Sequence, residues 1–131
     1  MERADSDRPL ILIAERDPFM RRALAQALEG RFELEFVDDG ADVLERARHR
    51  PPALVILETL LPTLDGFQVC RRLKRDPVTR HIPVLFFTLL LAEERAAQVG
   101  ADGFLLKPIR PEVLLSTVHC LLAGVAADEE V

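Results

Sequence analysis

Four positions in this chain carry polar or charged side chains directly after apolar runs, and these are the candidates for chemistry. The runs 10–14, 54–57, 82–87 and 104–106 are followed by Glu15, Glu58, Thr88 and Lys107, respectively. Carboxylate, hydroxyl and ammonium groups are the side chains that bind ions and charged substrates. Glu58 is the most informative of them, because it closes a strand-like run and precedes a loop punctuated by Pro62 and Gly66.

The apolar runs bring these four side chains together if they are strands of one parallel sheet. We predict strands over 10–14, 32–37, 53–57, 82–88 and 104–106, and helices over 18–28, 41–49, 66–75, 92–99 and 111–122. Most of the strands are apolar throughout, as parallel strands covered on both faces are. Right-handed crossovers then favour a flavodoxin-like, doubly wound α/β fold: a (βα)5 sandwich with a five-stranded parallel sheet in the order 2-1-3-4-5. In such a sheet, chemistry collects at the carboxyl ends of the strands.

Composition indicates one domain over residues 1–131, with a core over about 9–123 and polar tails at 1–8 and 124–131. The net charge of −5 argues against general nucleic-acid binding. No apolar run approaches the roughly 20 residues of a membrane helix, and the charged N-terminus lacks a secretory signal, so we expect a cytoplasmic protein. Cys70 and Cys120 lack metal-site spacing and are interpreted as packing residues.

The strand-end segments ILIAERDP, PALVILETLLPTLDG, IPVLFFT and GADGFLLKP follow one another in this order. Together they resemble the receiver domain of bacterial two-component response regulators, over essentially the whole chain. The resemblance implies a phosphorelay signalling module rather than an enzyme. It places Glu58 at the phosphoacceptor position, where an aspartate is usual, and Thr88 and Lys107 at the phosphate-contact positions. It also implies that the Lys107-Pro108 peptide is commonly cis. Thr88 is alternatively a strand-end residue that satisfies backbone groups, and Lys107 an ion-pair partner of Glu58 or Glu15.

The acidic pocket departs from the family pattern at its metal-binding positions. Glu15 falls at the first acidic position, but Arg16 falls at the second, and an arginine has no lone pair with which to bind magnesium. In the predicted pocket, the negative charges of Glu15 and Glu58 are balanced by the positive charges of Arg16 and Lys107. We therefore expect magnesium binding to be weak or lost, with no metal and no other cofactor, and we expect Arg16 to fork onto Glu58 or Glu15.

Glu58 is the second departure, because its carboxylate reaches about one bond further than that of an aspartate. In-line phosphoryl transfer depends on close positioning and on the metal ion. The sequence therefore favours a pseudo-receiver that is independent of phosphate and acts by protein–protein contact. The alternative is a working response regulator that takes phosphate from a histidine kinase. Within the first hypothesis, Glu58 either imitates the phosphorylated state or belongs to a pocket that is simply inactive.

The resemblance also implies a contact surface. Phe104 matches the aromatic switch position that acts with Thr88, with its ring either held inward or packed as an ordinary strand residue. The fourth helix (92–99), fifth strand (104–106) and fifth helix (111–122) form the face that such domains commonly present to a histidine kinase, an effector or a second copy as a homodimer. Leu89, Leu90 and Leu91 precede that helix, and they either extend this face or are buried in the core.

Overall fold

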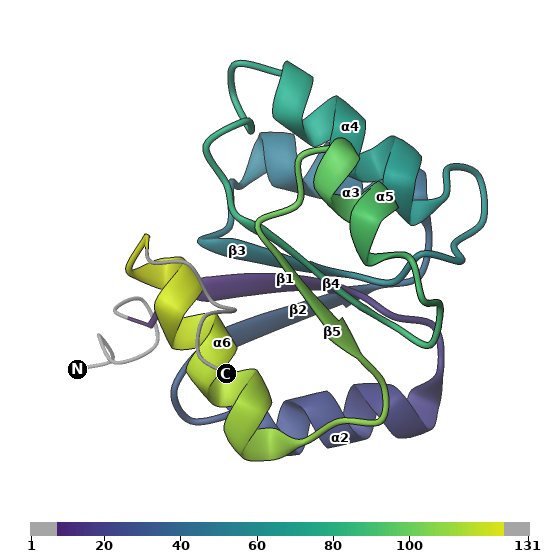
Figure 1. Ribbon diagram of the computed structural model, residues 1–131. Coiled ribbons are helices and arrows are strands. Elements are labelled where there is room, and N and C mark those ends of the chain that lie inside the picture. The colour runs from purple at the N-terminus through teal and green to yellow at the C-terminus, as the bar shows by residue number, and fades with distance from the viewer. Residues whose placement is uncertain (1–7, 125–131) are drawn as a thin grey trace.

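The computed structural model describes residues 8–124, which form five strands and five helices in alternation (Figure 1). The strands are β1 (Leu10–Ala14), β2 (Glu33–Val37), β3 (Leu54–Leu57), β4 (Val84–Thr88) and β5 (Gly103–Leu106). The helices are α2 (Pro18–Leu28), α3 (Gly40–His49), α4 (Gly66–Arg75), α5 (Glu93–Gln98) and α6 (Pro111–Leu122). All neighbouring strands pair in parallel, in the order β2-β1-β3-β4-β5, which confirms the flavodoxin-like fold.

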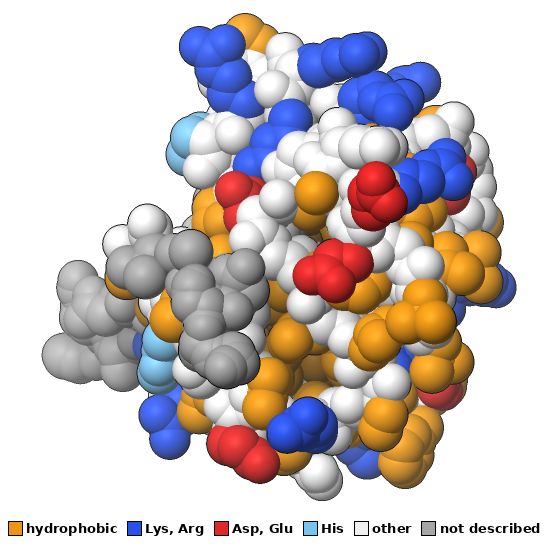
Figure 2. Space-filling model, in the orientation of Figure 1, with side chains coloured by type: hydrophobic (Ala, Val, Ile, Leu, Met, Phe, Trp, Pro, Cys, Tyr) orange, Lys and Arg blue, Asp and Glu red, His pale blue; other side chains and the backbone are white. Residues whose placement is uncertain are grey.

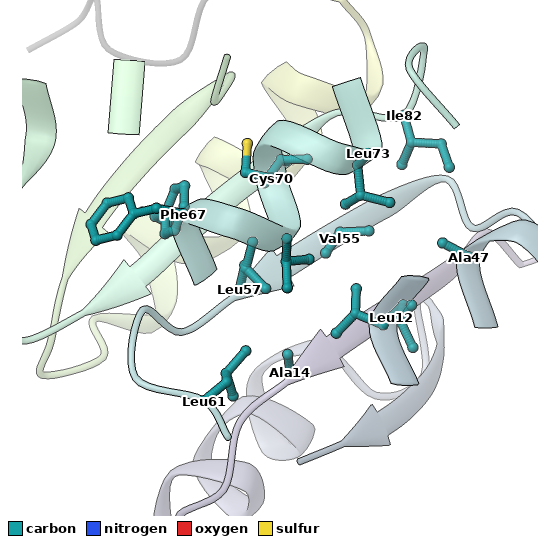
Figure 3. Close-up of a cluster of buried hydrophobic side chains, with 14 of the residues drawn as sticks. Leu12, Ala14, Ala47, Val55, Leu57, Leu61, Phe67, Cys70, Leu73 and Ile82 are labelled. Atoms are coloured by element: carbon teal, nitrogen blue, oxygen red, sulfur yellow. The ribbon is translucent and has the colours of Figure 1, made fainter. Parts of the chain in front are cut away.

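Helices cover both faces of the sheet. Successive side chains of a strand point to opposite faces, so each strand contributes to the core on both sides. In β1, Ile11 and Ile13 pack in the cluster beneath α2 and α6. Leu12 and Ala14 pack in the cluster beneath α3, α4 and α5, which Figure 3 shows in close-up. The continuous apolar runs of the sequence are thus explained by burial on two sides. Cys70 belongs to the second cluster, where burial raises the pKa of its thiol to about 12.

Side-chain caps fix where the helices begin at the carboxyl edge of the sheet. Asp17 accepts a hydrogen bond from the Phe19 amide and precedes Pro18, the first residue of α2. Asp65 and Gln68 form a reciprocal capping box at the start of α4. These caps hold the loops that carry Glu15 and Glu58 to the ends of β1 and β3.

The outer edge of β2 carries charged residues. Glu33 is bound by Arg50, with an Nη2 to Oε2 distance of 2.9 Å. Glu35 is bound by Arg46. Arg46 lies in the last turn of α3 and Arg50 is its C-cap residue. The carboxyl end of α3 therefore forms ion pairs with this edge strand.

A few boundaries differ from the sequence-based prediction. The fourth strand begins at Val84 rather than at position 82, because Pro83 has no N–H and offers only its carbonyl, 3.0 Å from the Val55 amide. The fourth helix is shorter than predicted, at six residues. The predicted tails lie outside the described residues, apart from positions 8 and 124. Within residues 8–124, no helix has the length and apolar character needed to cross a membrane.

Candidate functional site

Backbone hydrogen bonds beyond the strand ends bring the candidate residues together. The Glu15 amide donates to the Val37 carbonyl, and the Glu58 amide to that of Ala14, both at 3.1 Å. The Lys107 amide donates to the Thr88 carbonyl at 2.9 Å. The sheet ladder therefore continues one residue past β1, β3 and β5, and it fixes the backbone from which the site side chains project.

Lys107 is the centre of the site. Its Nζ lies 2.9 Å from Oε1 of Glu15 and 2.8 Å from Oε2 of Glu58. The three side chains are only 8%, 4% and 13% exposed, respectively. Both ion-pair partners considered for Lys107 are thus bound at once. The Lys107-Pro108 peptide that follows is cis.

The remaining carboxylate oxygens bind protein donors. Oε1 of Glu58 accepts from the Thr59 amide at 2.6 Å and from the Thr59 hydroxyl at 3.2 Å. Oε2 of Glu15 accepts from the Asp17 amide at 3.0 Å. Three of the four carboxylate oxygens therefore accept hydrogen bonds from within the chain, and the fourth, Oε1 of Glu15, is paired with the Lys107 ammonium group.

Thr59 is a site residue that the sequence analysis missed. Its side chain is buried, and its hydroxyl lies 2.9 Å from the hydroxyl of Thr88, which in turn accepts from the Leu90 amide at 3.2 Å. A continuous path of hydrogen bonds thus runs from Lys107 through Glu58, Thr59 and Thr88 to Leu90. The sequence feature that could have indicated it is the position of a hydroxyl residue directly after Glu58 and before Leu60 and Leu61.

The pKa values of the central pair support the charged forms. Burial opposes ionisation of Glu58, but Lys107, the nearby hydroxyl of Thr88 and the Thr59 amide together hold the pKa of this carboxyl below its ordinary value. Burial likewise opposes the charge on Lys107, but Glu58 and Glu15 raise the pKa of its ammonium group above its ordinary value. Each partner stabilises the charge of the other, so the ion pair persists near neutral pH.

Arg16 does not join the pocket, and the prediction that it forks onto Glu58 or Glu15 is wrong. Its side chain is exposed, and within residues 8–124 no ion pair connects it to either carboxylate. Neighbouring side chains of an extended segment point in opposite directions, so Glu15 faces inward and Arg16 faces solvent. The buried group of Glu15, Glu58 and Lys107 therefore carries one excess negative charge.

The loop between β3 and α4 is closed by a close approach of its two ends, at Glu58–Thr59 and at Gly66. The Gly66 amide donates to the Thr59 carbonyl at 2.8 Å, and a Cβ atom at Gly66 would lie 2.3 Å from the Glu58 carbonyl oxygen. The same loop is tied to α3, because the Thr63 hydroxyl donates to Asp39 at 2.7 Å. Glycine at position 66 is thus required for the loop to carry Glu58 and Thr59 as it does.

The predicted contact surface includes Phe104 and the three leucines that follow Thr88. Phe104 is partly buried against the cluster beneath α3, α4 and α5, and with Leu91, Glu93 and Leu106 it lines a shallow hollow. The alternative in which the three leucines are buried in the core is wrong. Leu89, Leu90 and Leu91 are 75%, 46% and 84% exposed, because the short α5 begins after them and leaves them uncovered.

The site offers two carboxylates, those of Glu15 and Glu58, as possible oxygen ligands for a cation. Magnesium needs several oxygen ligands in near-octahedral geometry. The Arg16 side chain has no lone pair to offer a cation, and Lys107 lies between the carboxylates of Glu15 and Glu58. Within residues 8–124, no group of three His, Cys, Asp or Glu side chains is arranged to hold a metal ion.

The parallel sheet, with its strand order β2-β1-β3-β4-β5 and helices on both faces, defines the doubly wound class of α/β domains. The family model of the response regulator receiver domain matches residues 11–119, and the chain belongs to this family. The chain is 39% identical to the response regulator PleD of Caulobacter vibrioides over 93 residues. It is 37% identical to the DNA-binding dual master transcriptional regulator RpaA of Synechocystis sp. over 118 residues.

The alignment covers 69% of this chain and 20% of PleD, and 87% of this chain and 49% of RpaA. The chain therefore spans half or less of the length of these relatives. Among solved structures, it is similar to the signal receiver domain of a signal transduction histidine kinase from Syntrophus aciditrophicus, with 35% identity and a TM-score of 0.82. That match covers 94% of this chain and 96% of the other.

Proposed function

We propose that this chain is a pseudo-receiver: a two-component signalling module that works without phosphorylation and acts by contact with a protein partner. The observation that carries the proposal is the position of Lys107 between Glu15 and Glu58. In this arrangement an internal cation occupies the carboxylates that a receiver would use for the metal and the phosphoryl group. The family assignment supports a role in cytoplasmic signal transduction rather than catalysis.

The position of Glu58 supports a pocket that is held in one state. Glu58 binds Lys107 directly and reaches Thr88 through the hydroxyl of Thr59. Both phosphate-contact positions are therefore engaged by groups of the protein itself. We propose that Glu58 and Thr59 together replace the phosphoryl group as the link between Lys107 and Thr88.

Loss of magnesium binding is the second part of the proposal. Phosphoryl transfer depends on a metal ion that neutralises charge on the transferring oxygens. Arg16 supplies no ligand, and an incoming ion would have to compete with Lys107 for both carboxylates. A working phosphoacceptor is the alternative function that this arrangement disfavours.

The contact surface of the proposed module is the face of α5, β5 and α6. Leu89, Leu91 and Leu106 are exposed there, next to the partly buried Phe104. We propose that this face binds a histidine kinase, an effector or a second copy of the chain. Sedimentation of the purified chain tests the homodimer, because without other proteins in the sample only self-association makes the mass rise with concentration. A Leu91→Gln, Leu106→Gln variant should then remain monomeric.

Treatment with acetyl phosphate and magnesium tests the proposal directly. Intact mass spectrometry should show no phosphoryl adduct on the wild type, and calorimetry should show no tight magnesium binding. The Glu58→Asp, Arg16→Asp double variant restores the usual acidic residues and is the positive control. A stoichiometric adduct on the wild type would establish the working receiver instead.

A further inference from the structure

A second surface of the molecule carries an unusual concentration of arginine. Between positions 71 and 81 the chain has five arginine and lysine residues and one aspartate, although its net charge is −5. Four of these cations are exposed arginines at the end of α4 and in the turn that follows it. They are Arg71, Arg72, Arg75 and Arg80, and we call them the arginine face. Figure 2 shows lysine and arginine side chains gathered at the top of the molecule, where α4 lies in Figure 1.

The helical spacing places three of these side chains on one side of α4. Residues three and four positions apart are neighbours on a helix surface, so Arg75 lies beside both Arg72 and Arg71. The opposite side of the helix is buried, through Cys70 and Leu73 among others. The arginine face is therefore the outer surface of a helix whose inner surface belongs to the core.

Nearby acidic groups do not neutralise the arginine face, because other cations already bind them. Asp76 pairs with Arg48 at 2.8 Å, and Asp102 pairs with Lys74 at 2.8 Å. Within residues 8–124, none of the four arginines forms an ion pair. Their charges thus face solvent without compensation from the described part of the chain.

The helix dipole explains only part of this arrangement. Cations are favourable in the last turn of a helix, which accounts for Arg72 and Arg75. The effect falls off beyond that turn, and Arg80 lies after the helix has ended. The charge therefore extends over a larger area than helix stability requires.

The backbone that carries the arginine face is rigidly held. The Thr79 hydroxyl donates to the Leu73 carbonyl at 2.8 Å, and the Arg80 amide donates to the Asp76 carbonyl at 2.8 Å. Lys74 Nζ donates to the Ile82 carbonyl at 2.7 Å. These bonds fold the turn against the end of α4, so binding there needs little ordering of the backbone.

We propose that the arginine face is a docking surface for an acidic segment of another protein. A guanidinium group binds a carboxylate through two parallel hydrogen bonds, which favours arginine over lysine for this purpose. The ten residues of α4 span about 15 Å, which suits a short segment. A nucleic acid or an anionic membrane extends much further and would also meet the acidic remainder of this chain. The proposal does not depend on the state of the Glu58 pocket.

Binding of a defined acidic peptide to the full chain tests the proposal. The probe is a fluorescein-labelled decapeptide of alternating glutamate and serine, and the reference peptide has glutamine in place of glutamate. Fluorescence anisotropy should show binding of the acidic probe only, weakening as salt is added. The variant Arg71→Gln, Arg72→Gln, Arg75→Gln should bind about tenfold more weakly.

The matched control removes the same charge elsewhere on the surface. Arg22, Arg31 and Arg110 are exposed, and their joint replacement by glutamine should leave the affinity within about twofold of the wild type. Equal weakening in this control, or no binding of the acidic probe by the wild type, would overturn the proposal. Tighter binding of a short DNA duplex or of phosphatidylserine vesicles, with the same loss in the Arg71, Arg72, Arg75 variant, would overturn it in favour of a phosphate-bearing partner.

Discussion

The hydroxyl groups of Thr59 and Thr88 lie 2.9 Å apart, so the loop after β3 and the end of β4 share a buried hydrogen bond. Thr59 also donates to Glu58, and Thr88 accepts from Leu90. The relationship joins the carboxylate at the centre of the site to the exposed leucines beside it. Neither residue alone would connect these two regions.

Replacement of Thr59 by valine should break this connection with little change in shape. The variant leaves the buried Thr88 hydroxyl without one of its partners, which costs about 1–3 kcal/mol in the free energy of unfolding. Urea denaturation measures the loss. The amide signal of Leu90 in a nitrogen–proton NMR spectrum should shift as well, whereas a Thr59→Ser variant should retain both the stability and the signal. An unchanged Leu90 signal in the valine variant would show that the hydroxyl does not act through Thr88.

Replacement of Lys107 by methionine should be strongly destabilising. The substitution leaves Glu15 and Glu58 buried without their shared cation, a change that typically costs about 3–5 kcal/mol. An Arg48→Met variant is the control, because its ion pair with Asp76 is much more exposed and should contribute about 1 kcal/mol or less. Urea denaturation of both variants tests the difference. Similar losses in the two variants would mean that burial of the Lys107 group has no special effect.

The stability of the protein should fall on both sides of a neutral plateau. The pKa of Glu58 is lower in the folded protein, so its contribution is present above its ordinary value of 4.5 and is lost as the pH falls through the folded-state value. The pKa of Lys107 is higher in the folded protein, so its contribution is present below 10.5 and is lost as the pH rises through the folded-state value. Urea midpoints measured against pH give the profile. A Glu58→Gln variant should show a shallower acid limb, and an identical limb would contradict this assignment.

Replacement of Gly66 by alanine should disturb the site through the backbone. The new Cβ would lie 2.3 Å from the Glu58 carbonyl oxygen, and relief of such a clash typically costs about 1–3 kcal/mol. Gly30→Ala is the comparison, because a Cβ there meets no atom within 4 Å and the cost comes only from the positive φ of 88°. The amide signals of Thr59 and Leu90 should move in the Gly66 variant and stay in place in the Gly30 variant.

The sheet was predictable because burial on two faces makes its central strands β1, β3 and β4 almost entirely apolar. The runs ending at Ala14, Leu57 and Leu106 therefore identified their strands, and these strand ends identified Glu15, Glu58 and Lys107 as neighbours. The pairing of both glutamates with one lysine follows from this arrangement. Which carboxylate oxygen binds which donor depends on loop geometry that the residue types do not determine.

The site residues that were predicted wrongly or missed lie in the loops that follow the strands, where the conformation of the loop determines the environment of each side chain. The composition of the pocket suggested that Arg16 would enter it, but the alternation of the chain after β1 directs this side chain to solvent. The leucines after Thr88 are apolar, yet no element covers them because α5 begins only at Glu93. Thr59 escaped notice because a single hydroxyl residue in a loop carries no periodic signal.

The ion pairs along β2 have a consequence for how the protein can associate. An exposed edge strand is a template for pairing with a strand of another chain, and charged side chains on that edge oppose such pairing. The pairs Glu33–Arg50 and Glu35–Arg46 place four charged groups along β2. Addition of a strand at this edge would require desolvation of these groups. The sheet is thereby protected against extension and aggregation at this side, and recognition is left to the helical surfaces and to the opposite edge at β5.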